Sequence, residues 1–373
     1  MDHSITFYKN QLKKHIIAVS ILKKQLLTYS LLRLITFLVT GFSIYIVLPN
    51  WQAAIATGVL GIAIFIFLLS KYTNKKAKRE LHKSLVTINE EELKIASGDF
   101  HHRPSGEQFQ DPLHFYSLDI DLFGKGSFFQ YINRTSSSES ESQLANALKA
   151  NKVSDIENRQ DAIKELSHKT EWTQLYTATK SLIKTETPAH TIINWLKTHK
   201  TFIPKYMLFA TWLFASISGI LLGLASLKVL GISYFGYWIF AGLGITGIYF
   251  KKVNILALNA DKTKETFRQY ASLLLQIENA TFTSKVLQGK QQQINSEHKK
   301  ASQIFADFSK CLDALDNRNN LFGAILGNGY LLLDIRNAYR VEQWISTYAR
   351  KVEDWCVYLG KHLHGVQWCG GVD

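Results

Sequence analysis

Two long apolar blocks interrupt an otherwise charged chain. The first covers residues 29–48 and 51–70, with a turn between them, and the second covers about residues 205–227 and 230–250. Each of the four runs is close to the roughly 20 residues that a helix needs to cross the hydrocarbon core of a bilayer. Buried helices of soluble proteins rarely stay uncharged over such lengths, so the pattern predicts four transmembrane helices in two hairpins.

The predicted spans carry little chemistry of their own. Arg33 lies within one or two turns of the start of the first span, where its side chain can reach the interface. None of the four runs contains an acidic residue, a histidine or a proline. Transporters usually need such groups at mid-membrane, so we interpret the spans as anchors and disfavour a transporter or channel. The pairs Gly58/Gly61 and Gly219/Gly223 would allow close helix packing.

Basic residues predict the orientation of these anchors. They flank the outer ends of both hairpins, whereas the loops within the hairpins are nearly uncharged. The positive-inside rule therefore places residues 1–28, 71–204 and 251–373 in the cytoplasm, at a bacterial-type plasma membrane. The net charge of +13 fits these flanks, and it also suits a negatively charged partner, either anionic lipid or nucleic acid.

Outside the spans the chain is predicted to be helical. Residues 71–98 read as a charged helix that continues from the second span and ends at Gly98. The stretch 289–300 is polar, and it is either an exposed part of a long helix or a turn between two antiparallel arms. The elements expected in the middle of the chain are a loop-to-helix stretch at 115–132, helices at 144–150, 156–166 and 172–183, and a turn at 192–196.

Residues 253–316 predict one or two long helices with an apolar seam for helix packing. A further helix is expected over residues 331–360, with Trp344 and Trp355 on its surface. The residues of the seam, which recur every three or four positions, are Phe267, Tyr270, Leu274 and Ile277, and then Ile304, Phe308, Cys311 and Leu315.

Motifs for catalysis or cofactor binding are weak in this sequence. A phosphate loop requires Gly-x4-Gly-Lys-Ser/Thr, and the Gly-Lys pairs at Gly124, Gly289 and Gly360 all lack the first glycine. Asp119 and Asp121 have no third ligand at a matching spacing, so we expect them to cap a helix or hold a loop rather than bind a metal. The cysteines show no metal-ligand spacing and no catalytic constellation is visible, so we predict no enzyme activity, no metal and no cofactor.

Residues 88–135 resemble the start of the core domain in membrane-anchored relatives of the MutS family of mismatch-repair ATPases. The similarity continues around residues 156–166, 315–320 and 328–336, and paired spans before and inside the core also fit those relatives. We interpret the residues that carry the resemblance as structural. They are Asp119, Asp121, Phe123, Gly124, Lys125, Gly126, Ser127, Gln130, Asn133, Arg134 and Thr135, followed by Arg159 and Gln160 in the next segment.

The resemblance implies that the chain is a helical core and lever region. In the family this region links DNA-clamping arms to an ATPase domain that binds ATP and magnesium. That domain is expected after about Trp355, but the chain ends at Asp373 with an atypical tail, so we expect a truncated or frameshifted relative. ATP and magnesium are therefore assigned to no residue of this chain.

Two functions remain as expectations from the sequence. The first is a membrane-tethered MutS-like core and lever module without its own ATPase, which contacts DNA non-specifically through lysines of residues 251–300 or is completed by a partner chain carrying an ATPase domain. The second is a scaffolding membrane protein that self-associates, for example as a homodimer, through its long cytoplasmic helices. The expected segments are a cytoplasmic N-terminal segment at 1–28, a transmembrane hairpin at 29–70, a core-like helical region at 71–204, a second hairpin at 205–250, a long-helix lever and core region at 251–360, and the tail at 361–373.

Overall fold

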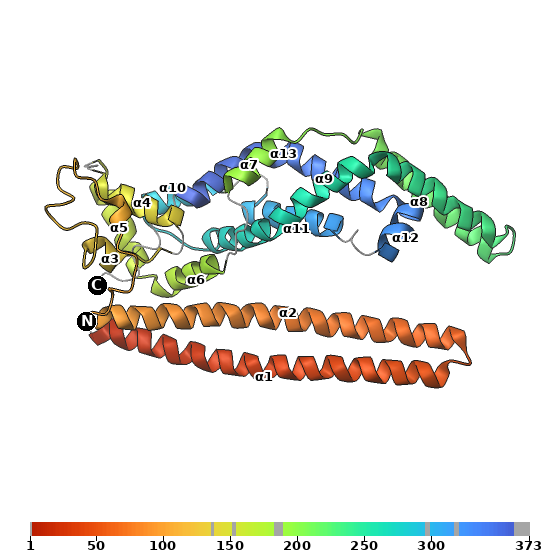
Figure 1. Cartoon of the computed structure of the whole chain (residues 1–373), viewed down its shortest axis with the longest axis horizontal. Coiled ribbons are helices and arrows are strands. Elements are labelled where there is room, and N and C mark those ends of the chain that lie inside the picture. The colour runs from red at the N-terminus through yellow and green to blue at the C-terminus, as the bar shows by residue number, and fades with distance from the viewer. Residues whose placement is uncertain are drawn as a thin grey trace. The chain divides into compact units, whose positions relative to one another are not determined.

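The computed structural model describes residues 2–135, 138–150, 154–182, 189–294, 299–316 and 321–361 (Figure 1). Helices account for 81% of these residues, which include no strand, so the all-α prediction is confirmed. Four of the helices are long and apolar enough to cross a membrane, as the sequence predicts. The helices, in chain order, are α1 (Asp2–Val47), α2 (Trp51–Ala96), the short 3-10 helix η1 (Glu107–Phe109), α3 (Phe128–Ile132), α4 (Ser138–Lys149), α5 (Ile156–Ser167), α6 (Thr170–Ser181), α7 (Ala189–Thr198), α8 (Tyr206–Ser226), α9 (Ile232–Glu278), α10 (Lys285–Ile294), α11 (Ala301–Asp316), α12 (Leu321–Leu331) and α13 (Leu333–Lys361).

The chain divides into two compact units, and each contains one of the apolar hairpins. Unit 1 consists of residues 1–152 and 166–182, together with the last residues of the chain, which lie outside the described part. Unit 2 consists of residues 153–165 and 183–365.

Unit 1 is built on the hairpin of α1 and α2, which lie side by side along their length (Figure 1). The side chain of Asn50 caps α2 by accepting a hydrogen bond from the backbone N–H of Ala53 at 3.3 Å. The helices pack closely where Gly61 faces Thr40, because a Cβ at Gly61 would lie 2.3 Å from the Thr40 side chain. Both helices run without a break from the apolar runs into charged sequence, so α2 extends to Ala96 as one rod.

Unit 2 is organised around α9, which continues from its apolar run to Glu278. Helix α11 runs antiparallel to the second half of α9, and the predicted seam closes between them: the rings of Phe267 and Phe308 meet edge to face with centroids 4.7 Å apart. The seam prediction is confirmed, and α10 and α11 show that the chain after α9 turns back rather than continuing as one helix.

Two expectations about unit 2 are wrong. Residues 189–198 form a helix rather than a turn at 192–196, because Ile192 and Leu196 form an apolar face that is buried. Trp344 is not on the surface of its helix: its ring stacks on Phe308 with centroids 3.6 Å apart, and its Nε1 donates to the Ile304 carbonyl at 3.1 Å. Trp355 is buried as well. The periodicity of α13 gives the position of its faces, but not which face a neighbour covers.

Gly219 and Gly223, which would allow close helix packing, make no such contact within the described part of the chain. A Cβ at either position would meet no described atom within 4 Å. The close approach in unit 2 occurs instead between α9 and α12, where Gly242 faces the backbone of Gly329.

Candidate functional site

The loop that follows α2 folds compactly together with the motif at residues 119–135 that resembles the MutS family. We call residues 97–135 the junction. Gly98 ends the preceding turn with a φ of 86°, a backbone conformation that favours glycine. Gly106 has a φ of 74°, and a Cβ there would lie 2.5 Å from the ring of Phe129. The glycine at position 106 therefore lets the loop pass close over the core of the junction.

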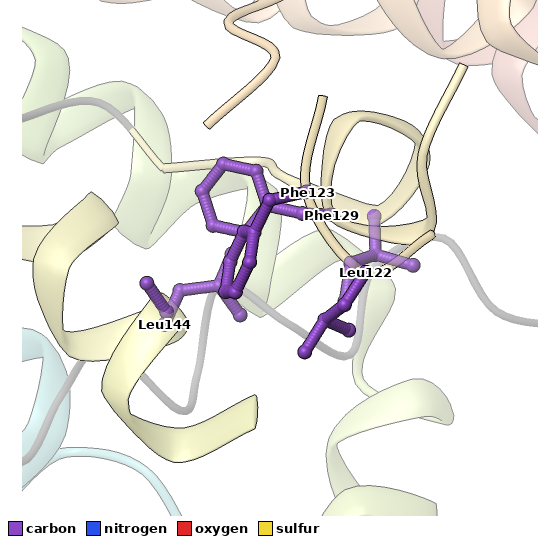
Figure 2. Close-up of a cluster of buried hydrophobic side chains, with 6 residues drawn as sticks. Leu122, Phe123, Phe129 and Leu144 are labelled. Carbon is purple, nitrogen blue, oxygen red and sulfur yellow. The ribbon is translucent and has the colours of Figure 1, made fainter. Parts of the chain in front are cut away.

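That core is a small hydrophobic cluster of unit 1, shown in Figure 2. Leu122 and Phe123 from the motif loop and Phe129 from α3 gather there with Leu144 from α4. Phe129 is fully buried, and its ring lies 5.3 Å from that of Phe123. Burial of these aromatic rings is the main force that closes the loop.

The buried amide of Gln130 holds the backbone of the loop. Its Oε1 accepts from the Gly126 N–H at 2.8 Å, and its Nε2 donates to the carbonyls of His101 at 3.1 Å and Arg103 at 2.6 Å. Ser127 caps α3 by accepting from the Gln130 N–H at 3.2 Å. The polar side chains of Gln130 and Ser127 are thus used within the fold.

Arg134 attaches the motif to the last two turns of α2, and Asn133 holds the neighbouring loop. The Arg134 Nε donates to Oε1 of Glu92 at 2.7 Å, and both side chains are about 10% exposed. Arg103 donates from Nε to the Asn133 carbonyl at 2.8 Å, and the Asn133 Oδ1 accepts from the Thr135 N–H at 3.0 Å. A charge-assisted hydrogen bond at low exposure resists bending between the rod and the motif.

The remaining motif residues are not gathered at one site. Asp119, Asp121 and Lys125 are exposed, and Asp121 has a φ of 47° in a turn. Arg159 and Gln160 are exposed on α5, in the part of that helix that belongs to unit 2. The motif therefore forms a structural junction with an exposed acidic turn, rather than a pocket lined by its polar side chains.

Sequence reasoning missed a histidine pair in unit 1. The Nδ1 atoms of His15 on α1 and His82 on α2 lie 3.0 Å apart, so one ring donates a hydrogen bond to the other. Burial lowers the pKa of both rings, and the positive charge of Lys14 lowers both further, while Glu171 of α6 raises the pKa of His15. The two histidines are 67 positions apart, and only the antiparallel pairing of α1 and α2 brings them together.

A buried carboxylate in unit 2 fixes the approach to α8. Glu342 of α13 accepts hydrogen bonds from the backbone N–H groups of Phe202 at 2.9 Å and Ile203 at 3.1 Å, and from Nε2 of His199 at 3.1 Å. Its side chain is 3% exposed. This contact holds the turn that leads into the third apolar run.

Within the described part of the chain, no group of three or more His, Cys, Asp or Glu residues is placed to hold a metal ion. The contacts described above hold helices and loops together. Comparisons with protein-family models, with curated proteins and with solved structures found no match to this chain, so the resemblance to the MutS family rests on the residues quoted above.

Proposed function

We propose that this chain is a membrane-anchored, non-catalytic helical module related to the core and lever region of MutS-family proteins. One observation carries the proposal: the family-like motif is fixed by the Arg134–Glu92 ion pair to the end of α2, an unbroken rod that begins in an apolar hairpin. Because the rod has no break, a force or displacement at the motif is passed to the membrane anchor.

The lipid bilayer is the first partner under this proposal. The four apolar helices α1, α2, α8 and α9 cross it as two hairpins, and their basic flanks face the anionic cytoplasmic surface. The N-terminus and the polar halves of α2 and α9 then lie in the cytoplasm.

Contact with DNA through lysines of residues 251–300 is the expectation that the ion pairs of unit 2 support least. Basic side chains of the expected arms are neutralised within unit 2: Lys264 pairs with Asp316, and Arg268 with Asp313 at 2.7 Å. A lysine already paired with a carboxylate contributes less to phosphate binding. Exposed Lys285 and Lys300 remain for weak, salt-sensitive contact with a nucleic-acid backbone.

A protein partner is the second candidate, and one observation favours it. The motif loop exposes two large apolar side chains, Leu113 and Phe115, each 92% exposed. Self-association through the seams of the long helices is less favoured, because the α9 and α11 seams already cover each other inside unit 2.

The test uses the full chain in lipid nanodiscs of neutral phosphatidylcholine. DNA binding is measured by fluorescence anisotropy at low and at physiological salt, for the wild type and for Lys285→Gln/Lys300→Gln. Binding that weakens with salt and in the variant supports DNA contact. Absence of binding removes the DNA part, and mass photometry of the same nanodiscs then tests for a second copy. Extraction of the chain from membranes by alkaline carbonate would overturn the anchor itself.

A further inference from the structure

Helix α12 of unit 2 has the composition of a membrane segment but not the length of one. Residues 321–333 contain no charged residue, and Asn328 is the one strongly polar side chain among them. At 11 residues, α12 is about half as long as a helix that spans the bilayer. The position of α12 relative to α8 and α9 therefore decides whether lipid or water surrounds this helix.

The C-terminal end of α12 lies at the middle of both apolar runs. Gly329 packs backbone to backbone against Gly242, which is ten residues after the start of α9. The Tyr330 carbonyl accepts from Oγ of Ser218, twelve residues into α8, at 2.7 Å. At about 1.5 Å per residue, both contacts lie roughly 15–18 Å along the apolar helices. A helix in contact at this depth shares the surroundings of the spans.

The chain enters and leaves this depth on the same side. Before α12, Asp316 pairs with Lys264, which lies in the polar half of α9. After it, Glu342 binds the backbone just before α8. Between these two anchors, α12 packs against α8 and α9 and α13 leads back along α8, as in a re-entrant element.

At the break between α12 and α13, protein side chains hydrogen-bond to the backbone groups that a helix would otherwise pair, as a turn within lipid requires. Leu332 has a φ of 50°, and the Asp334 N–H that follows donates to Oδ1 of Asn328 at 2.8 Å. Ser218 also accepts from Nε1 of Trp238 at 2.8 Å while it donates to Tyr330. Irregular backbone at membrane depth is tolerated only where protein groups satisfy it in this way.

From these contacts we infer that residues 321–332 form a re-entrant helix that enters one leaflet and faces lipid acyl chains. The inference rests on the proposed insertion of α8 and α9. Three apolar side chains of α12 are open to contact with lipid: Ile325 is 39% exposed, Leu326 53% and Leu331 41%. The cation of Arg336, 3.9 Å above the ring of Trp212, then lies toward the lipid headgroups, where both side chains are commonly found.

The test is site-directed spin labelling of the full chain in lipid nanodiscs, with the three native cysteines replaced by alanine. Single cysteines are placed at Leu326, at Phe240 in the apolar run of α9, and at Leu275 in its polar half. These side chains are 53%, 69% and 46% exposed, so a label fits at each. Collision with oxygen, which concentrates in lipid, is compared with collision with a water-soluble nickel complex.

We expect the Leu326 label to collide more with oxygen than with nickel, like the Phe240 label, and the Leu275 label to show the reverse. If the label at Leu326 collides mainly with nickel while the label at Phe240 collides mainly with oxygen, the re-entrant helix is refuted and the membrane anchor is not. Low collision with both reagents at Leu326 would show that protein covers it, which also overturns lipid contact. A nickel-accessible Phe240 would instead refute the insertion of α9.

Discussion

The contact between Gly242 of α9 and Gly329 of α12 gives the sharpest prediction. An alanine Cβ at position 242 would lie 2.2 Å from the Gly329 carbonyl oxygen and 2.6 Å from that of Asn328. Both are backbone atoms, so no side-chain rotation relieves the clash, and the two helices have to move apart. Gly244, two positions away on the same helix, has no described atom within 4 Å of its would-be Cβ and is the matched control.

The expected magnitude follows from two opposing effects. Replacing a helical glycine by alanine gains roughly 0.5–1 kcal/mol, because alanine loses less backbone freedom on folding. Overpacking costs typically about 1–3 kcal/mol. We expect Gly244→Ala to be neutral or slightly stabilising, and Gly242→Ala to lose about 0.5–2 kcal/mol of unfolding free energy. Gly329→Ala should fall between them, because its Cβ meets the side chain of Ile239 rather than backbone.

The measurement is the unfolding free energy in mixed detergent micelles, from titration with a denaturing detergent, for wild type and the three variants. Helix content of each folded variant serves as the control for intact starting material. Equal stability of Gly242→Ala and Gly244→Ala would refute the close packing of α9 on α12, and with it the depth assigned to α12.

Three further predictions concern polar contacts. Gln130→Ala leaves the Gly126 N–H and two backbone carbonyls without their partner, and we expect a loss of about 2–4 kcal/mol in the unfolding free energy of unit 1. Glu342→Ala leaves two backbone N–H groups before α8 without an acceptor, and we expect the unfolding free energy to fall by about 2–5 kcal/mol in the same assay. The lowered pKa of His15 and His82 means that the unfolded chain binds more protons, so stability should fall as the pH drops below about 6.5 in thermal melts, and His82→Gln should flatten that dependence.

The first two of these predictions have a control in the same unit. Lys125 belongs to the motif but is exposed, so Lys125→Ala should change the unfolding free energy by less than about 0.5 kcal/mol. A change as small as this for Gln130→Ala would contradict the structural role of the Gln130 amide. Glu353→Ala removes a half-exposed pair with Lys197 and should cost at most about 1 kcal/mol. Unchanged pH dependence in His82→Gln would place the titrating groups elsewhere.

The local sequence pattern is sufficient to predict the apolar helices and the α9 seam. Both depend on local pattern: the length of an uncharged run must match the bilayer thickness, and a seam must repeat at the helical period. The runs at 29–48 and 51–70 and the seam residues Phe267 and Phe308 are read correctly for that reason.

Which surfaces face each other depends on tertiary contacts that local pattern does not encode. An apolar helix of 11 residues is too short to be predicted as a span, and the depth inferred for α12 depends on the contacts of Gly329 with Gly242 and of Tyr330 with Ser218. His15 and His82 meet because α1 and α2 are antiparallel. Trp344 is buried because α11 covers its side of α13. In each case the helical period predicts the face of the helix on which a residue lies. Whether that face is buried depends on a packing partner that is distant in the chain.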